Sequence, residues 1–384
     1  MGPCSPSALS PFLSPGDRDT ANAINHIGGV PVWELAKGLL AGGHEVSVST
    51  LDARAASETV ELAGPNLKIS IHRARPRARE FLVDNYRRER GLLAQSIRDF
   101  KPDIVHGHWT YEYALGALDA GLPCVITAHD SPFTVVRHFK DAYRVARLLI
   151  AQQVASRTDH LSAVSPYLED RWKRQMRYPR QIEVIPNSAP TDMPELLREP
   201  AANPIIISIG DAGRLKNIRP LIQAFASVRL LMPSAELRLI GPGLGENDEI
   251  CLESQALGLD EGLRFLGLLD RPAVAREFAS AWLVAHPSLE EACPMTLLEA
   301  LGAGVPALGG HRSGGVPYLL DWGRQGWLCD VTDPRAIASC MLEIVSSGPP
   351  QPKPGRQEFL DTNFSIQAVT NKYLGWYRDV LRAI

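Results

Sequence analysis

The sequence predicts an α/β protein built from two doubly wound domains, each with a parallel sheet covered by helices on both faces. Short apolar segments alternate with helix-like segments through both halves of the chain. Such runs, bounded by polar or turn residues, are typical of strands buried between helices. The length of 384 residues also allows two or three domains, each with a core of its own.

The two halves of the chain show the same alternation. In the first half, the expected strands are residues 44–50, 103–108, 124–129, 160–165 and 182–186. In the second half they are residues 205–210, 235–241, 263–267, 282–288 and 306–310. Between the first two strands of the second half, Leu221, Phe225, Val228 and Leu231 recur at helical spacing, which predicts a helix with one buried face.

The segment from Pro186 to Pro204 separates the two halves. It contains five prolines and few periodic apolar positions, so it reads as a linker between domains. Residues 346–356 form a second proline-rich loop, and residues 364–381 are expected to form a closing helix.

Composition excludes several classes of protein. A net charge of −3 gives no general attraction to nucleic acid. The six cysteines show neither zinc-binding spacing nor a dense disulfide framework, so a reducing cytoplasm is the expected location. No apolar run is long enough to span a bilayer, and the first twenty residues lack the design of an export signal.

The strongest chemical signal lies in residues 287–306. A loop follows the strand that ends near Ser288, and a helix is expected to begin near Pro294, a residue favoured in the first turn. The free backbone N–H groups around Met295 and Thr296, together with the helix dipole, suit a diphosphate.

Two glutamates flank that helix start. Glu299 lies about a turn and a half into the helix, where its carboxylate can accept hydrogen bonds from the two vicinal hydroxyls of a ribose. Glu291 precedes the helix and can reach a sugar hydroxyl beyond the phosphates.

This constellation resembles the E-x7-E segment of the retaining family 4 glycosyltransferases, the "glycosyl transferases group 1", because Glu291 and Glu299 are separated by seven residues and followed by 300–306, Ala-Leu-Gly-Ala-Gly-Val-Pro. In that family the first Glu binds the donor sugar and the second binds the ribose. The family usually places a small residue, an aromatic residue and Gly after its first Glu, whereas this chain has 292–294, Ala-Cys-Pro.

A second signal is the turn after the strand 205–210. Lys216 lies between that strand and the next helix, where an ammonium group can meet phosphate oxygens. The segment resembles the Arg/Lys diphosphate clamp of the same family, although the family Arg aligns with Asp211. Arg214 is the candidate substitute for that Arg, with a simple surface role as the alternative.

These cations would neutralise the leaving nucleoside diphosphate, so neither a metal nor a cofactor is expected. The acidic residues Asp330 and Asp333 are interpreted as a turn rather than a metal site.

The first domain supplies the expected acceptor side. The strand 124–129 closes with His129, and in the resembled family a His at this place approaches the reacting sugar. His108 ends the preceding strand, 103–108, and Trp109 follows it; both are acceptor-side candidates. Gly28 and Gly29 resemble the glycine-rich loop near the donor phosphates, and the family's first strand should precede them, with residues 7–15 as the candidate.

The stretch 73–90 contains seven arginines beside an apolar stripe formed by Leu82, Tyr86, Leu93, Ile97 and Phe100. A solvated surface helix is the favoured interpretation. The sharper alternative is peripheral contact with an anionic inner membrane face that carries a lipid-linked acceptor.

The resemblance implies a GT-B fold, in which two Rossmann-like domains face a central cleft. Residues 1–188 would form the acceptor-side domain, with the helix 365–384 packed back on it, and residues 189–364 the nucleotide-sugar-binding domain. It implies transfer of a sugar from a UDP-, GDP- or ADP-sugar to a glycan, lipid-linked or small-molecule acceptor, as in polysaccharide biosynthesis. Glu291 would orient the sugar, Lys216 would stabilise charge and His129 would position the reacting end.

Two rival functions stay open at this level. One is a nucleotide-sugar epimerase of GT-B type, which would turn over donor without an acceptor. The other is a non-catalytic scaffold that binds sugar nucleotides, an idea favoured by the departure at Asp211. A dehydrogenase is not favoured, because no G-x-G-x-x-G follows a good first strand.

Overall fold

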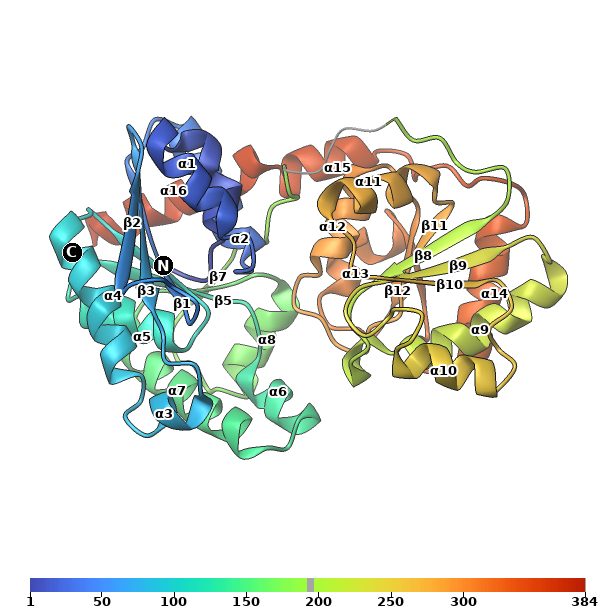
Figure 1. Cartoon of the computed structure of the whole chain (residues 1–384), viewed down its shortest axis with the longest axis horizontal. Helices are drawn as coiled ribbons and strands as arrows, with labels where there is room; N and C mark the ends of the chain where they lie inside the picture. The colour runs from blue at the N-terminus through green and yellow to red at the C-terminus, as the bar shows by residue number, and fades with distance from the viewer. Residues whose placement is uncertain (192–196, 384) are drawn as a thin grey trace. The chain divides into compact units, whose positions relative to one another are not determined.

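The computed structural model describes residues 1–191 and 197–383, and these form two compact α/β units (Figure 1). The first unit comprises Met1–Ser188 together with Ser365–Ile384, and the second comprises Ala189–Phe364. Parallel strands alternate with helices in both units, which confirms the predicted fold class.

The second unit is built on a six-stranded sheet in the order β10-β9-β8-β11-β12-β13, with every neighbouring pair parallel. Its strands are β8 (Ile205–Ile209), β9 (Glu236–Ile240), β10 (Leu263–Gly267), β11 (Leu283–His286), β12 (Ala307–Gly310) and β13 (Trp327–Cys329). The first five were predicted from their apolar runs. The short edge strand β13 was not, because its three residues carry no distinctive pattern.

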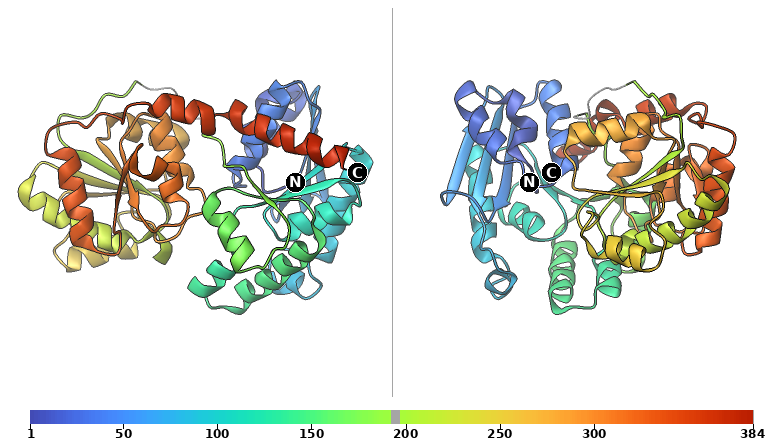
Figure 2. Two further views of the ribbon diagram at one scale, coloured as in Figure 1. Left: turned by 180° about the vertical axis from the view of Figure 1, so that it is seen from behind. Right: turned by 45° about the vertical axis from the view of Figure 1, so that its right-hand side comes forward.

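Helices cover both faces of this sheet, with α9 and α14 on one side and α11 to α13 on the other (Figures 1 and 2). The helical segments are η2 (Arg214–Lys216), α9 (Ile218–Leu231), α10 (Glu249–Ala256), α11 (Arg271–Ser280), α12 (Met295–Gly302), α13 (Val316–Leu319), η3 (Asp321–Gly323), α14 (Pro334–Val345) and α15 (Arg356–Asn363). The core buries Leu221, Phe225 and Val228 of α9 as predicted. The prediction for Leu231 was wrong: this last residue of α9 is 70% exposed, because the packed face has ended by then.

The first unit contains two sheets. One has the parallel order β4-β5-β6-β7, formed by β4 (Val105–His108), β5 (Cys124–Ala128), β6 (Leu161–Ala163) and β7 (Ile182–Val184). The other has the order β1-β3-β2, formed by β1 (Val46–Asp52), β2 (Thr59–Ala63) and β3 (Leu67–Arg73). β1 and β3 are parallel, whereas β2 and β3 are antiparallel. The hairpin of β2 and β3 was not predicted from the sequence.

The helices of the first unit are η1 (Pro6–Phe12), α1 (Pro15–Ala23), α2 (Val30–Ala41), α3 (Ala78–Leu82), α4 (Arg87–Phe100), α5 (Glu112–Asp119), α6 (Pro132–His138), α7 (Ala142–Arg157), α8 (Pro166–Arg174) and α16 (Ile366–Arg382). The closing helix α16 lies beside α2 (Figure 2). Its buried residues Val369, Tyr373 and Tyr377 share an apolar cluster with Leu35 and Val125. This packing explains why the end of the chain belongs to the first unit.

The start of the chain differs from the expected strand at 7–15. Residues 6–12 form a 3₁₀ helix and α1 begins at Pro15, because Pro6, Pro11 and Pro15 lack a backbone N–H and fix φ near a helical value. Met1 and Gly2 are instead extended between β1 and β4. The amide of Gly2 donates to the carbonyl of Ser49 at 3.4 Å, and the amide of His108 donates to the carbonyl of Met1 at 2.7 Å.

The arginine-rich stretch is not one helix. Asn85 and Tyr86, with φ of 54° and 57°, separate α3 from α4. Arg75 pairs with Asp84 at 2.9 Å and with Glu89 at 2.5 Å. Much of this positive charge is therefore paired within the unit. Across the described parts of the chain, no helix is both long and apolar enough to cross a bilayer.

Candidate functional site

A largely buried carboxylate forms the centre of the second unit's candidate site. Glu291 follows β11, and its Oε1 lies 2.5 Å from Nζ of Lys216 and 3.2 Å from Nε2 of His286, the last residue of β11. Burial alone would raise the pKa of Glu291, but His286 and Lys216 outweigh it and lower the pKa to about 2. Glu291 is therefore ionised at neutral pH, and an ionised carboxylate acts as a hydrogen-bond acceptor, for example toward sugar hydroxyls.

The loop after β8 brings Lys216 to this carboxylate across 75 positions of sequence. Asn217 holds the loop in place: its side-chain amide donates to the carbonyls of Pro287 at 3.2 Å and Val331 at 2.7 Å. Asn217 has a φ of 56°, a conformation that asparagine tolerates better than most residues. A further bond from the amide of Leu289 to the carbonyl of Leu215, 2.8 Å long, ties the same two loops together.

Asp211, which stands where the resembled family has Arg, shapes the turn. Its Oδ1 accepts a 2.7 Å hydrogen bond from the amide of Gly213, an arrangement typical of Asx turns. Arg214 is exposed on the adjoining turn of η2, in the same loop as Lys216. Asp211 thus stabilises the turn locally, while Arg214 and Lys216 provide two positive charges near the end of β8.

Helix α12 carries the remaining candidates of the second unit. It begins at Met295, so Pro294 is its N-cap rather than a residue of the first turn. Met295 and Thr296 are half-buried and form the first turn, whose amides have no intrahelical partner. Glu299 is 8% exposed, and its Oε1 accepts a 2.7 Å hydrogen bond from Nη1 of Arg271, the first residue of α11.

His286, Asn217 and Arg271 were not predicted as site residues. His286 was named only as the end of a strand, and its contact with Glu291 depends on the turn that follows. A left-handed Asn before a helix is a weak signal for Asn217, because asparagine also occurs in ordinary turns. Nothing in the sequence points to the pairing of Arg271 with Glu299, whose positions differ by 28.

In the first unit, three predicted residues form one aromatic cluster. Nδ1 of His108 lies 3.0 Å from Nε2 of His129, and the ring of Trp109 stacks on His129 with centroids 4.3 Å apart. Trp109 holds a φ of 61°, a strained conformation for a bulky residue. His106, in contrast, bonds to the hydroxyl of Tyr377 in α16 at 2.6 Å and so belongs to the packing of that helix.

Burial keeps this histidine cluster neutral. It lowers the pKa of His129 to about 3 and holds the pKa of His108 well below its ordinary value. Asp130, which accepts two 3.0 Å hydrogen-bond contacts from the hydroxyl of Tyr111, has its pKa raised by burial to about 6. His129 therefore offers a neutral imidazole, suited to hydrogen bonding rather than to charge neutralisation.

The glycine pair precedes α2. Gly29 is the N-cap of that helix with a φ of 111°, and a Cβ added there would lie 1.7 Å from the carbonyl oxygen of Pro3. Glycine is required at this position for both reasons. A Cβ at Gly28 would meet nothing within 4 Å, so that position is open space.

The predicted residues thus fall into local groups within each unit. The second unit brings Lys216 to Glu291 and places Glu299 on α12 with Met295 and Thr296. The first unit brings His108, Trp109 and His129 together, while Gly28 and Gly29 lie in the loop before α2. Each group lies at the carboxyl end of a strand or the start of a helix, where α/β folds bind ligands.

Comparison with known proteins identifies glycosyltransferases as relatives of this chain. The family described as "Glycosyl transferases group 1" matches residues 190–358, and "Glycosyltransferase Family 4" matches residues 28–193. An N-acetyl-alpha-D-glucosaminyl L-malate synthase of Bacillus anthracis is 27% identical over 300 residues, 73% of this chain and 75% of the relative. A D-inositol 3-phosphate glycosyltransferase of Nocardioides sp. is 27% identical over 390 residues, 88% of this chain and 80% of the relative.

Solved structures share the fold. Sucrose-phosphate synthase from Thermosynechococcus elongatus superposes with a TM-score of 0.77 at 18% identity, covering 93% of this chain and 95% of that protein. Anabaena HepE in complex with UDP and glucose gives a TM-score of 0.65 at 16% identity, covering 93% and 96%. Because the two family matches extend from residue 28 to residue 358 and the architecture is that of GT-B enzymes, the chain belongs to the family 4 glycosyltransferases.

Proposed function

We propose that this glycosyltransferase moves a sugar from a nucleoside diphosphate sugar to a small hydroxylated acceptor, with retention at the anomeric carbon. The contact of Lys216 with the ionised Glu291, next to the first turn of α12, is the observation that carries the proposal. It supplies, in one place, a cation for phosphate, an acceptor for sugar hydroxyls and unpaired helix amides. The curated relatives, named for malate and inositol 3-phosphate, support an acceptor of small size.

In this proposal, protein groups stabilise the negative charge on the leaving diphosphate. Lys216 and the amides of Met295 and Thr296 stabilise the negative charge that develops as the glycosidic bond to phosphate breaks. No metal or cofactor has a role in that step. Arg214, exposed in the same loop, adds a second cation for the phosphates.

The two glutamates hold the two sugars of the donor. Glu291 orients the transferred sugar through its hydroxyls, and Glu299 accepts hydrogen bonds from the ribose. Arg271 is bonded to Glu299, so in this proposal it fixes the orientation in which the carboxylate meets the ribose. Arg271 is in this sense a positioning residue.

The acceptor hydroxyl attacks on the face from which the diphosphate leaves. Its proton passes to an oxygen of the leaving diphosphate, so the new glycosidic bond forms as the old one breaks and no protein nucleophile is needed. His129 contributes a neutral imidazole that hydrogen-bonds the transferred sugar, and Trp109 holds the ring of His129 by stacking. Gly28 and Gly29 allow the backbone to approach the phosphates closely.

The experiment is a donor and acceptor panel. UDP-, GDP- and ADP-sugars are incubated with malate, with an inositol phosphate and with no acceptor, while nucleotide release is measured and the product's anomeric configuration is read by NMR. We expect acceptor-dependent release with one donor and retained configuration. Turnover of donor without acceptor would favour the epimerase, and binding without any turnover would favour the scaffold.

Variants connect that activity to the site. Glu291→Gln and Lys216→Met should each lower turnover by roughly a hundredfold or more, on the scale of losing one charge-stabilising group. Glu253→Gln is the matched control, since Glu253 lies on α10 and pairs with Arg219 on the exposed surface. Equal activity in all three variants would contradict the assigned roles.

We propose a cytoplasmic location, with residues 73–90 as a solvated surface. The pairing of Arg75 with Asp84 and Glu89, and of Arg90 with Asp119 at 2.5 Å, supports this interpretation over membrane binding. Sedimentation with vesicles that contain or lack anionic lipid tests it. Stronger pelleting with anionic vesicles at physiological salt would favour peripheral contact with the membrane.

A further inference from the structure

The loop before α2, residues 24–29, carries Gly28 and Gly29 and is fixed at both of its ends. At the first end, the carbonyl of Ile24 accepts a 2.9 Å hydrogen bond from Oγ of Ser5, and the Ile24 side chain packs against an apolar cluster of this unit. At the other end, Gly29 is the N-cap of α2, and its carbonyl accepts a 2.8 Å hydrogen bond from the amide of Val32. Residues 25–28 therefore bridge two fixed points.

Between these two points, a single polar contact connects the loop to the sheet. Nε2 of His26 lies 3.1 Å from both Oδ1 and Oδ2 of Asp52. No other hydrogen bond or ion pair to residues 25–28 comes from any residue that the structure describes. Because an ionised carboxylate offers only acceptor atoms, Nε2 of His26 is the donor in this contact.

Asp52 is itself held firmly in place. It is the last residue of β1, and its side chain is only 6% exposed. Its Oδ1 accepts a 2.9 Å hydrogen bond from the amide of Arg54. Its backbone carbonyl accepts hydrogen bonds from the amides of Ala55 at 3.3 Å and Ala74 at 3.1 Å. The carboxylate that receives His26 is thus fixed by the segments that follow β1 and β3.

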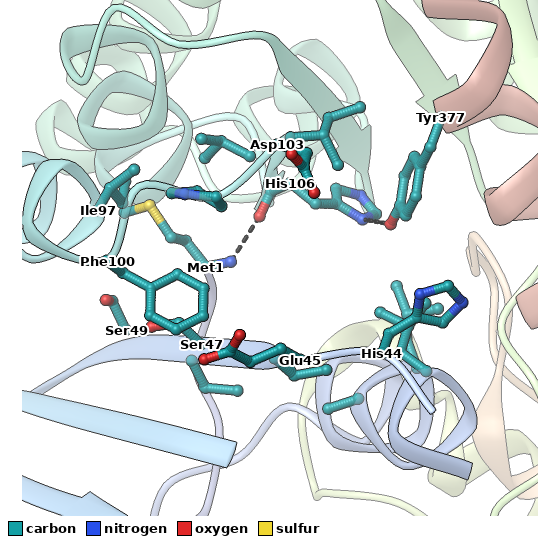
Figure 3. Close-up of a pocket in the computed structure, with 18 of the residues that line it drawn as sticks. Met1, His44, Glu45, Ser47, Ser49, Ile97, Phe100, Asp103, His106 and Tyr377 are labelled. Carbon is teal, nitrogen blue, oxygen red and sulfur yellow. Dashed lines mark hydrogen bonds between the residues drawn. The ribbon is translucent and has the colours of Figure 1, made fainter. Parts of the chain in front are cut away.

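The contact between His26 and Asp52 lies at the carboxyl end of β1. His44 and Glu45 precede this strand and line a separate cavity (Figure 3), which includes neither His26 nor Asp52 in its walls. The carboxyl ends of parallel strands are where α/β folds bind ligands. His26 therefore holds the glycine loop at the end of β1 where a ligand is expected.

The loop presents backbone donors to that end of the unit. Among the residues that the structure describes, none accepts a hydrogen bond from the amides of Ile27, Gly28 or Gly29. Successive free amides before a helix suit the oxygens of a phosphate. A mobile loop loses conformational entropy when it binds such a ligand, whereas a loop that is already held in place loses less.

We propose that His26 is a positioning residue, which holds the glycine loop through Asp52 in the conformation that offers its amides to the donor diphosphate. The inference rests on the proposed function, because that function assigns the donor phosphates to this loop. His26 acts through the backbone of Gly28 and Gly29 and needs no contact of its own with the donor. Its loss should therefore weaken donor binding more than it slows the transfer step.

Three variants separate this role from a general effect on the fold. His26→Ala removes the donor to Asp52. His26→Gln keeps an N–H donor on a side chain of similar reach, so it should restore the contact. His44→Ala is the matched control, since His44 is an exposed histidine of the same unit that lies outside the loop (Figure 3).

The first measurement needs no ligand. Order parameters of the Gly28 and Gly29 amides are obtained by NMR relaxation. We expect values near about 0.85 in the wild-type protein, in His26→Gln and in His44→Ala, and values below about 0.6 in His26→Ala. Low values in the wild-type protein, unchanged values in His26→Ala, the same fall in His44→Ala, or no recovery in His26→Gln would each overturn the proposal.

The second measurement is steady-state kinetics with the donor that the panel identifies. His26→Ala should raise the KM for the donor by roughly fivefold or more and change kcat by less than about twofold, because the entropy of ordering the loop falls on binding. A fall in kcat with an unchanged KM would contradict the assigned role. A wild-type protein that binds no sugar nucleotide would instead refute the proposed function, and the order parameters would still decide whether His26 holds the loop.

Discussion

The contact between Lys216 and Glu291 makes a quantitative prediction about the variant Lys216→Met. Nζ and Oε1 are 2.5 Å apart, and the Glu291 side chain is only 14% exposed. Removing the ammonium leaves a largely buried carboxylate, with the imidazole of His286 as its remaining side-chain neighbour at 3.2 Å. Methionine has a similar reach without the charge, so the loss is mainly electrostatic.

The lowered pKa of Glu291 gives the size of the free-energy change expected for Lys216→Met. Its fall from 4.5 to about 2 corresponds to about 3 kcal/mol of stability, at 1.36 kcal/mol for each pKa unit. His286 and Lys216 share that effect, so we expect Lys216→Met to cost about 1–2 kcal/mol. A lowered pKa stabilises the folded state above the unfolded pKa, and this stability is lost as pH falls from about 4.5 to about 2.

A double-mutant cycle with Lys216→Met and Glu291→Gln isolates the pair. The free energy of opening is measured by amide hydrogen exchange in β8 and β11, because a chain of two units need not unfold in one step. We expect a coupling of about 1–2 kcal/mol at pH 7 that shrinks on acidification below pH 4.5. The control is Arg219→Met with Glu253→Gln, an exposed pair whose coupling should stay below about 0.5 kcal/mol.

A coupling at neutral pH no larger than that of the exposed pair would refute the reasoning. So would a coupling that is unchanged at low pH, because protonation of Glu291 must remove it. In either case the charge interaction between Lys216 and Glu291 would not stabilise the site as calculated, and the proposed binding of the diphosphate and sugar would lose its electrostatic basis.

Three further predictions concern single residues. Arg271→Ala should weaken binding of a nucleoside diphosphate by roughly fivefold or more, measured by titration calorimetry, because Glu299 loses the 2.7 Å bond that orients it; unchanged affinity would show that Arg271 does not position it. Gly29→Ala should destabilise the first unit by about 1–3 kcal/mol in urea unfolding, whereas Gly28→Ala should have little effect, since only Gly29 combines a φ of 111° with a blocked Cβ; equal effects would contradict this account. The imidazole of His129 should remain neutral in NMR titrations down to about pH 4, because burial lowers its pKa to about 3, and protonation near pH 6 would contradict the buried geometry.

The alternation of apolar strands and helices was readable in the sequence. Every strand of the second unit except β13 was predicted near its observed bounds, as was the closing helix. Strands that are buried on both faces are apolar along their whole length. Such a run of apolar residues can be recognised in the sequence without knowing which strands lie beside it in the sheet. The motif from Glu291 to Glu299 was equally visible, because its spacing along one loop and one helix is itself local.

Other features depended on contacts between distant residues. In the hairpin of β2 and β3, β2 is mostly exposed, whereas β3 is mostly buried and alternates Leu67, Ile69 and Ile71 with polar residues. That alternation is a local strand signal that was not used, while the antiparallel pairing of β3 with β2 and its parallel pairing with β1 depend on distant residues. The expected strand at 7–15 was wrong because the prolines there favour a helical turn, while Met1 and Gly2 pair with two strands that lie far along the chain.

The fold class, the family resemblance and the charged residue types that the chemistry requires can be read from local patterns along the chain. Which of these residues meet depends on packing: Lys216 reaches Glu291, His286 and Arg271 contact the two glutamates, and Asn217 holds the loop after β8. The difference lies in how far apart the interacting groups are along the sequence. Strand and helix patterns arise from neighbours a few residues apart, whereas a buried ion pair and the pKa it sets arise from groups that only the packed sheet brings within hydrogen-bonding distance.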